Sequence, residues 1–219
     1  MNELEGGRPA PEIGLRELKK RMTHESIADA ALQLTVEKGL DSVTIDEIAR
    51  QAFVSPRTVS NYFSSKEEAV VVAGAPAWIT VVEQFGEGPH TERPLAMLRD
   101  ALAEFAESCT EEQLRICVQS VELVGRYPAL RPYQTAEYDK LEEALRIRVA
   151  QRTDTDVESD MYPWLVAAAA VAALRSAMRL WAQRGGRSGR LPFKIRDAFD
   201  LFSEGLPAPS RERETSPAT

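Results

Sequence analysis

Residues 44–66 read TIDEIARQAFVSPRTVSNYFSSK, and this stretch decides which fold the sequence predicts. Thr44 is followed three positions later by Glu47, a spacing typical of a capping box at the start of a helix. Ser55 and Pro56 form a second start signal, because serine is a favoured N-cap and proline is favoured at the first helical position. The stretch therefore predicts two short helices joined by a turn of about three residues, as in a helix-turn-helix.

The second of these helices is expected to place polar side chains on an outward face. Val59 and Phe63 are four positions apart and should point into the core. A third helix is expected from Lys66, because Ser65 and Glu68 repeat the capping-box spacing. The side chains left on or near the outer surface of the second helix suit a DNA groove, and they are Arg57, Thr58, Asn61 and Tyr62.

Residues 27–66 resemble the DNA-binding domain of the TetR family of bacterial transcription repressors. The likeness rests on the IADAALQL helix of residues 27–34, the TI-x-x-IA pattern of residues 44–49 and the YF-x-x-KE pattern of residues 62–67. Two positions depart from the family pattern. Phe53 stands where the family usually has a turn glycine, and it would strain a turn that needs positive φ unless another backbone solution exists. The sequence leaves open whether its ring packs into the domain.

We expect the second helix of the motif to read the bases of a palindromic operator. Arg57 suits guanine, Asn61 suits adenine or a nearby phosphate, and Thr58 suits a thymine methyl group. The resemblance implies a second set of contacts that fix the register on phosphates. Ser60 is the other departure, because the family usually has a phosphate-contacting aromatic residue there. The residues implied for phosphate contact are Thr44, Ser55, Tyr62 and Lys66. Pro56 and Ser60 complete the predicted DNA-binding residues of the motif.

A basic cluster stands before the first predicted helix and contains Arg16, Lys19, Lys20 and Arg21. A flexible arm there would follow the DNA backbone or enter a minor groove. Taken alone the cluster reads as a solvated patch, but beside a helix-turn-helix we favour DNA contacts by Lys19, Lys20 and Arg21. The formal net charge of −7 argues against a general nucleic-acid coat, although a specific DNA reader can be acidic overall.

The 219 residues, 43% of them hydrophobic, are enough for two domains with cores of their own. Helical periodicity recurs along the chain and strand signals are absent, so the predicted fold class is all-α. We expect disordered tails at 1–15 and 206–219, a helix-turn-helix domain at 16–66, and a helical effector-binding and dimerisation domain at 67–205.

The larger domain is predicted to end in two helices, near residues 161–183 and 191–204. In the TetR family the last two long helices form a four-helix bundle across a twofold axis, which implies a homodimer here. The alternative is that both helices only complete a monomer core. The apolar run from Trp164 to Leu174 is expected to be too short for a membrane span. No secretory signal precedes it, so we expect a cytoplasmic protein without membrane contact.

Aromatic and apolar residues of the larger domain are expected to line a cavity for a small-molecule effector. Ordinary core packing is the alternative for each of them. Arg115 and Arg175 lie in apolar stretches, where each would bind an anionic ligand group or pair with a carboxylate such as Glu104 or Glu122. The predicted ligand residues are Trp78, Phe105, Val121, Tyr127, Tyr138, Trp164 and Arg175.

We expect a small, largely apolar effector that releases the dimer from DNA by favouring a conformer with wrongly spaced recognition helices. Residues 127–181 also resemble an actinobacterial TetR subgroup that includes the mycofactocin-associated regulator. That likeness implies a long-chain acyl-coenzyme A as the effector. Both interpretations stay open at this point.

Catalysis, a cofactor and a metal site are not predicted. The two histidines, His24 and His90, have no nucleophile at a telling spacing, and no phosphate-binding glycine loop is present. Cys109 and Cys117 lack partners at metal-ligand spacing and are expected to be small hydrophobes in a reducing compartment. The alternative to a regulator is an all-helical protein-interaction module that keeps the helix-turn-helix only as a structural unit.

Overall fold

A computed structural model describes residues 14–75, 78–85, 93–186 and 190–208 of the protein. Every regular element within these ranges is a helix, so the prediction of an all-α fold is confirmed. Contacts between residues divide the chain into two compact units, and the division lies between Ala73 and Gly74. His90 and most of the two predicted tails, residues 1–13 and 209–219, lie outside the described residues.

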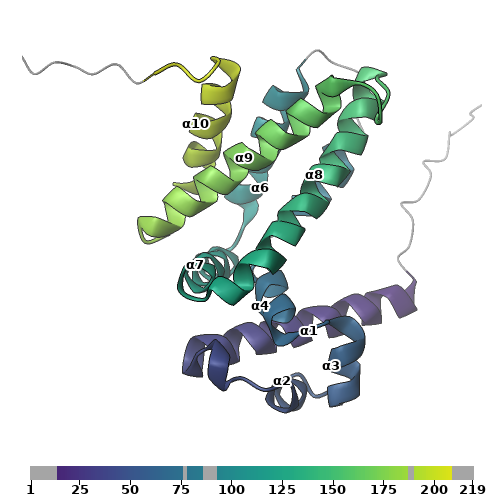
Figure 1. Ribbon diagram of the computed structural model, residues 1–219, viewed down its shortest axis with the longest axis vertical. Helices are drawn as coiled ribbons and strands as arrows, with labels where there is room; N and C mark the ends of the chain where they lie inside the picture. The colour runs from purple at the N-terminus through teal and green to yellow at the C-terminus, as the bar shows by residue number, and fades with distance from the viewer. Residues whose placement is uncertain (1–13, 76–77, 86–92, 187–189, 209–219) are drawn as a thin grey trace, which may run out of the picture. The chain divides into compact units, whose positions relative to one another are not determined.

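The first unit packs short helices against one long helix (Figure 1). Ile27, Ile48 and Val59 are completely buried, and each comes from a different helix. The core of the unit is therefore built from at least three helices. The long helix contacts the first and the last of the short α-helices. The elements are α1 (Leu15–Lys38), the 3-10 helix η1 (Leu40–Ser42), α2 (Ile45–Gln51), α3 (Pro56–Tyr62) and α4 (Lys66–Ala73).

The predicted helix starts of this unit are present. Thr44 Oγ1 accepts a hydrogen bond from the Glu47 amide at 3.3 Å, and the Glu47 carboxylate accepts one from the Thr44 amide at 3.0 Å. Ser55 Oγ accepts from the amide of Thr58 at 3.0 Å, with Pro56 in the first turn. These bonds satisfy amides that a helix start leaves without intrahelical partners, and so they fix where α2 and α3 begin.

The cap of α4 differs from its prediction in one bond. Ser65 Oγ accepts from the Glu68 amide at 3.2 Å, as a capping box requires. The Glu68 carboxylate, however, accepts from the amide and the hydroxyl of Ser64, at 2.6 and 2.7 Å, and not from Ser65. The reciprocal bond is displaced by one residue because Ser64 offers two donors to one carboxylate oxygen.

Phe53 occupies the left-handed residue of the turn between α2 and α3. Its φ is 55°, and it follows the C-cap residue Ala52. The amide of Val54 donates to the carbonyl of Ala49 at 2.9 Å, and the amide of Phe53 donates to the carbonyl of Arg50 at 3.3 Å. This bond pair is a Schellman motif, whose left-handed position normally holds glycine. The ring is 96% exposed, so it does not pack into the domain, which the sequence had left open.

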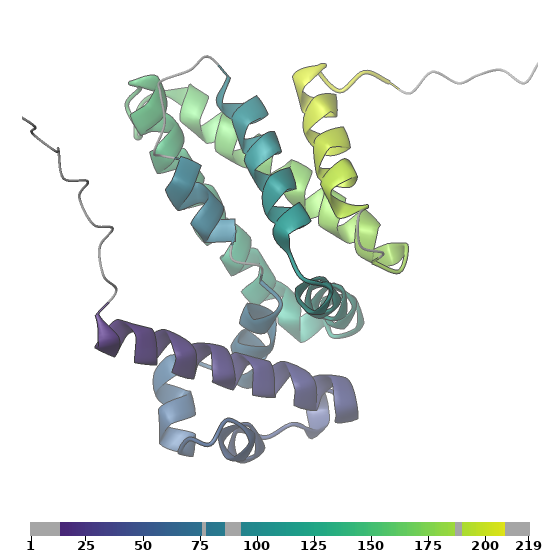
Figure 2. The same cartoon turned by 180° about the vertical axis from the view of Figure 1, so that it is seen from behind.

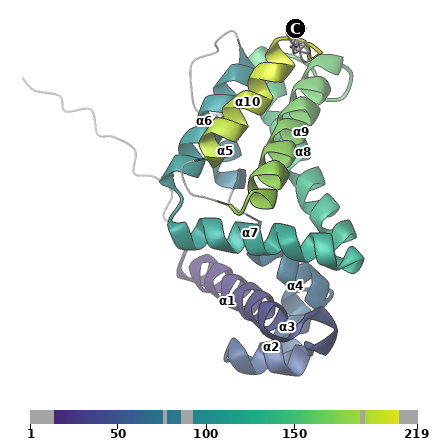
Figure 3. The ribbon, with the colours of Figure 1, turned by 90° about the vertical axis from the view of Figure 1, so that its left-hand side faces the viewer.

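The second unit is a bundle in which α9 is central, since α9 contacts α6, α7, α8 and α10. α8 and α9 lie side by side (Figure 1), and α6 lies between α5 and α10 when seen from behind (Figure 2). α7 runs across the other helices, lengthwise in Figure 3. The elements are α5 (Trp78–Phe85), α6 (Pro94–Ser108), α7 (Glu111–Arg126), the 3-10 helix η2 (Pro128–Leu130), α8 (Arg131–Thr153), α9 (Met161–Gln183) and α10 (Leu191–Ser203).

Small side chains on α9 allow this central position. Ala167, Ala170, Ala173 and Ala177 are all buried, which lets neighbouring helices approach closely. The whole of α9 is long and apolar enough to cross a membrane by length and composition, contrary to the expectation from the shorter run within it. Because 56% of its apolar window is buried inside the protein, packing in the core accounts for this composition.

Phe53→Gly is expected to raise the free energy of unfolding by about 1 kcal/mol, because glycine adopts positive φ without the steric cost of a Cβ atom. Thermal or urea unfolding measures the change. Phe53→Ala is the matched control, since alanine removes the exposed ring and keeps the Cβ. An equal gain in the alanine variant would show that the ring, and not the backbone, is the source of the strain.

Candidate DNA-binding surface and ligand cavity

The outward face of α3 carries two long polar side chains that the fold leaves available. Arg57 and Asn61 are one helical turn apart and exposed. In the described part of the chain neither forms an intramolecular hydrogen bond or ion pair. Their donors and acceptors are therefore directed to solvent or to a partner, as sequence-specific contacts with base edges require.

The smaller polar residues of α3 bond within the helix. Ser55 Oγ and Thr58 Oγ1 lie 2.8 Å apart, and Ser60 Oγ donates to the carbonyl of Pro56 at 3.2 Å. Ser60 therefore already has a partner for its proton, and only its lone pairs are free to accept. A phosphate needs donors, so this bond makes Ser60 a poor substitute for the aromatic residue of the family pattern.

An aromatic cluster connects the end of α3 with α1. The His24 ring stacks on Phe63 with centroids 4.5 Å apart, and Tyr62 lies 6.1 Å from the same imidazole. Phe63 is buried, and Tyr62 is half-buried. His24 thus holds the predicted phosphate contact Tyr62 in place from the side, a role that helical periodicity could not reveal because the residues are about forty positions apart.

The basic cluster belongs to a helix and not to a flexible arm. α1 begins at Leu15, so the four basic residues lie in its first two turns. Lys19 and Lys20 are exposed, and Arg21 lies 3.8 Å from Glu25 in a partly solvated ion pair. Leucine and lysine are good helix formers and the segment lacks glycine and proline, which explains why the helix extends through it.

Lys66 has structural partners. Its ammonium donates to the carbonyls of Leu40 and Val43, at 2.8 and 2.9 Å. An ion pair between Lys38 and Glu47 ties the end of α1 to α2, and this pair together with Thr44 lowers the pKa of Glu47 to about 2. Both lysines therefore hold the segment before α2, and one proton of the Lys66 ammonium remains for a phosphate.

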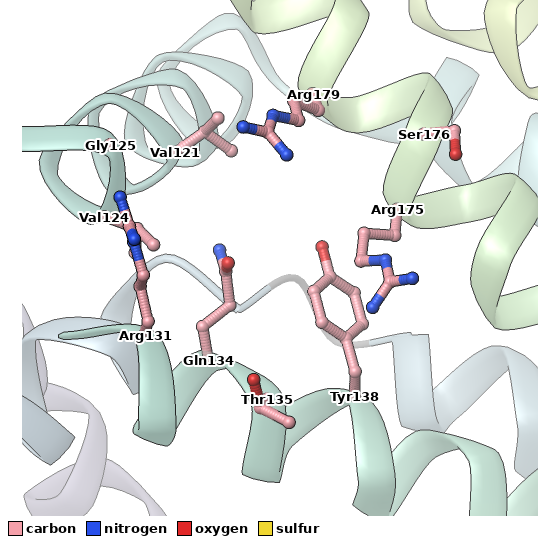
Figure 4. Close-up of a pocket in the computed structure, with 10 residues that line it drawn as sticks. All are labelled: Val121, Val124, Gly125, Arg131, Gln134, Thr135, Tyr138, Arg175, Ser176 and Arg179. Atoms are coloured by element: carbon pink, nitrogen blue, oxygen red, sulfur yellow. The ribbon is translucent and has the colours of Figure 1, made fainter. Parts of the chain in front are cut away.

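The second unit contains a cavity of about 540 Å³ between α7, α8 and α9 (Figure 4). Its lining is polar and basic, with three arginines and no acidic residue. The side chain of Arg179 extends into the opening from α9, and those of Gln134 and Tyr138 rise from α8. The lining residues are Val121, Val124, Gly125, Arg131, Gln134, Thr135, Tyr138, Arg175, Ser176 and Arg179.

Three of the seven predicted ligand residues, Val121, Tyr138 and Arg175, line this cavity. Burial raises the pKa of Tyr138, and the charge of Arg175 partly offsets that rise. Tyr138 therefore remains a protonated hydrogen-bond donor at neutral pH. Tyr138 is the one aromatic residue among the ten that line this cavity, so the expected aromatic lining is not found here.

The other four predicted ligand residues have other places. The rings of Trp78 and Phe105 are 5.0 Å apart at the hydrophobic core. Tyr127 is the C-cap of α7. Trp164 is 45% exposed, donates to the Val157 carbonyl at 3.1 Å, and carries the Arg146 guanidinium 4.1 Å from its ring centre. Aromatic character alone did not distinguish residues that line the cavity from core residues such as Trp78, or from Trp164, which bonds to a loop.

The two arginines singled out by sequence differ in their pairing. Arg115 is exposed and bonds to Glu112, so the expected pairing with a carboxylate is present, although the partner is neither Glu104 nor Glu122. Arg175 is also exposed, and within the described ranges it forms no ion pair. Sequence reasoning missed Arg131 and Arg179, although Arg179 follows Arg175 by one helical turn and so had to share its face.

Comparison with known proteins agrees with both units. The profile of the family "MftR C-terminal domain" matches residues 92–207, just over half of the chain, and that of "Bacterial regulatory proteins, tetR family" matches residues 27–70. The chain belongs to the TetR family. As a TetR-family protein it is a transcription regulator, and neither matched family is a family of enzymes.

Two relatives of this TetR-family chain extend over most of its length. TcmR, an HTH-type transcriptional regulator of Streptomyces glaucescens, is 26% identical over 176 residues, which are 78% of each chain. The Mycobacterium tuberculosis protein designated mycofactocin biosynthesis transcriptional regulator MftR is 25% identical over 189 residues, 86% of this chain and 93% of its own.

Solved structures share the fold at lower identity. SmeT, the repressor of the Stenotrophomonas maltophilia efflux pump SmeDEF, is 18% identical with a TM-score of 0.54, over 90% of this chain and all of its own. Thermus thermophilus FadR, solved with lauroyl-CoA, is 22% identical with a TM-score of 0.51 over the same shares.

Among the described residues of our chain, no group of histidine, cysteine and carboxylate side chains is arranged to hold a metal.

Lys66→Ala is expected to lower the free energy of unfolding by about 2 kcal/mol, because two carbonyls lose a charged donor. Urea denaturation measures the loss. Lys20→Ala, on the exposed face of α1, is the matched control and should leave stability within about 0.5 kcal/mol. If Lys66→Ala leaves stability unchanged, the two carbonyl bonds do not stabilise the fold, and only the predicted phosphate contact of Lys66 remains.

Proposed function

We propose that this TetR-family regulator binds a palindromic operator as a homodimer, represses transcription from it, and is released by a small-molecule effector. The observation that carries the proposal is the pair of exposed side chains on α3, Arg57 and Asn61, on a recognition helix capped at Ser55. The family supplies the class of partner, double-stranded DNA. Cytoplasmic location follows from that partner.

In this proposal Arg57 reads guanine and Asn61 reads adenine or a nearby phosphate. Thr58, half-buried and bonded to Ser55, offers its methyl group to thymine. Phosphates are held by Thr44, at the exposed start of α2, and by the other predicted contacts on the motif. The set of phosphate contacts is then Thr44, Ser55, Tyr62 and the remaining donor of Lys66, with Lys19, Lys20 and Arg21 of α1 alongside.

Homodimerisation is supported by the outer faces of α9 and α10. Leu165 and Leu180 on α9 are 60% and 49% exposed, and Phe193 and Leu201 on α10 are 65% and 46% exposed. Large apolar side chains left outside by a completed core favour burial against a second copy. A twofold axis also suits a palindrome, whose half-sites lie about 34 Å apart along the DNA.

Effector control is supported by the place of α7. α7 lines the cavity through Val121 and Val124. It also carries Ser120 against Gly74 so closely that a Cβ atom at Gly74 would lie 1.9 Å from Ser120 Cβ. Gly74 follows directly after the last residue of α4, so a ligand that displaces α7 acts on the connection to the helix-turn-helix. Such a ligand changes DNA affinity by binding one conformer better than the other.

The first experiment is selection of bound sequences from random duplex DNA, followed by titration of the selected operator against unselected DNA of equal length. Arg57→Ala should cost about 1–3 kcal/mol on the operator and relax the preference at one base pair. Arg126→Ala, an exposed arginine at the end of α7, is the matched charge control. Equal losses on both DNAs would exclude base reading by Arg57, and failure to select any sequence would favour the interaction-module alternative.

Leu180→Glu is expected to convert the dimer to a monomer, because a carboxylate at a buried apolar interface is costly. Sedimentation velocity measures the mass, and operator affinity should fall with it. Ile147→Glu, at a 39% exposed position on α8, makes the same chemical change on another helix and should leave the dimer intact. A monomeric wild-type protein that still binds a full palindrome would contradict this interface.

A further inference from the structure

We propose that the cavity between α7, α8 and α9 binds the phosphate groups of its ligand through Arg131, Arg175 and Arg179. This inference rests on the proposed effector control and names the chemical class of the effector. It excludes the small, largely apolar effector, one of the two that the sequence left open, because the ligand carries at least two negative charges.

Unlike four other arginines of the same unit, the three guanidinium groups have no carboxylate partner among the described residues. In the part of the chain that the structure describes, Arg131, Arg175 and Arg179 form no hydrogen bond or ion pair, and none of the ten lining residues is acidic. The contrasting arginines pair as Arg99 with Asp100 and Asp200, Arg115 with Glu112, Arg146 with Glu143, and Arg196 with Glu107.

This contrast is informative because carboxylates are abundant. The chain has 34 aspartates and glutamates against 27 lysines and arginines. A surface rich in acidic residues makes ion pairs easy to form, and four arginines of this unit have formed them. Three unpaired guanidinium groups around one cavity therefore leave a local positive potential that only an added anion would neutralise.

The geometry brings the three groups to one opening from two helices. Arg175 and Arg179 are one turn apart on α9, so they share a face of that helix. Arg131 stands on the first turn of α8, and the side chain of Arg179 points into the space between the helices (Figure 4). All three are exposed, which keeps the cavity accessible to a ligand from solvent.

Phosphate is the anion that fits this arrangement. One carboxylate would neutralise one of three charges, whereas a phosphate monoester or a diphosphate carries about two or more at neutral pH. The planar guanidinium fork binds two phosphate oxygens at once. Gln134, Thr135 and the protonated hydroxyl of Tyr138 add neutral donors at the same place.

The remaining space admits an organic part of the ligand. The cavity, at about 540 Å³, lies within the range of about 300–1,000 Å³ that small-molecule sites occupy. Val121 and Val124 supply apolar surface on the α7 side. The same phosphate chemistry is offered by a small free phosphate compound and by the nucleotide part of a coenzyme A thioester, so the experiment separates these two sources.

The experiment is isothermal titration calorimetry of the full chain with four probes: inorganic pyrophosphate, coenzyme A, lauroyl-CoA and neutral dodecanol. We expect at least one phosphate probe to bind, and its affinity to fall at least tenfold in the double variant R175Q/R179Q and with rising salt. The double variant R115Q/R148Q removes two charges outside the lining and should bind as the wild type does. Circular dichroism confirms that the variants are folded.

Binding by pyrophosphate would identify a free phosphate compound, and binding by lauroyl-CoA or coenzyme A without pyrophosphate would identify a nucleotide ligand. The proposal is overturned if no phosphate probe binds, if R175Q/R179Q binds like R115Q/R148Q, or if dodecanol binds as tightly as lauroyl-CoA. Operator binding is measured on the same samples. A wild-type protein that selects an operator and ignores phosphates refutes this inference alone, whereas loss of operator selection refutes the proposed function.

Discussion

Close packing around α9 is the constraint on which the second unit depends. A helix that touches four neighbours can do so only with small side chains where the helices cross, and the buried alanines of α9 meet this requirement. The buried face covers only part of the circumference of α9. Arg175, Arg179 and Leu180 lie outside that face, so the rotation of α9 that buries the alanines also exposes the residues that we propose for contact with a ligand and with a second copy.

In the first unit, polar bonds at helix ends have the comparable role. Its helices α2 and α3 have seven residues each, too short to be stable alone. Side-chain caps at Thr44 and Ser55 and the donations of Lys66 to two carbonyls hold them at defined positions. With those ends held, the face of α3 that carries Arg57 needs no further support, and its side chains remain free for recognition.

Phe53 shows a different balance between stability and surface chemistry. The Schellman bonds around it are made, so the turn has the conventional geometry with an unconventional residue. A left-handed phenylalanine raises the energy of the folded state, and its exposed ring gains nothing from burial.

Local signals in the sequence were enough to determine the starts of α2, α3 and α4, the helix-turn-helix, the all-α class and the inward side chains of α3. These features depend on contacts within a few residues, so spacing alone reveals them. Where the cavity lies, that Trp78 and Phe105 belong to the core, and that Arg131 meets Arg175 and Arg179, were decided only by tertiary structure. Those outcomes depend on how α7, α8 and α9 cross, and the crossing is set by the packing of all their buried faces together, which no single segment encodes.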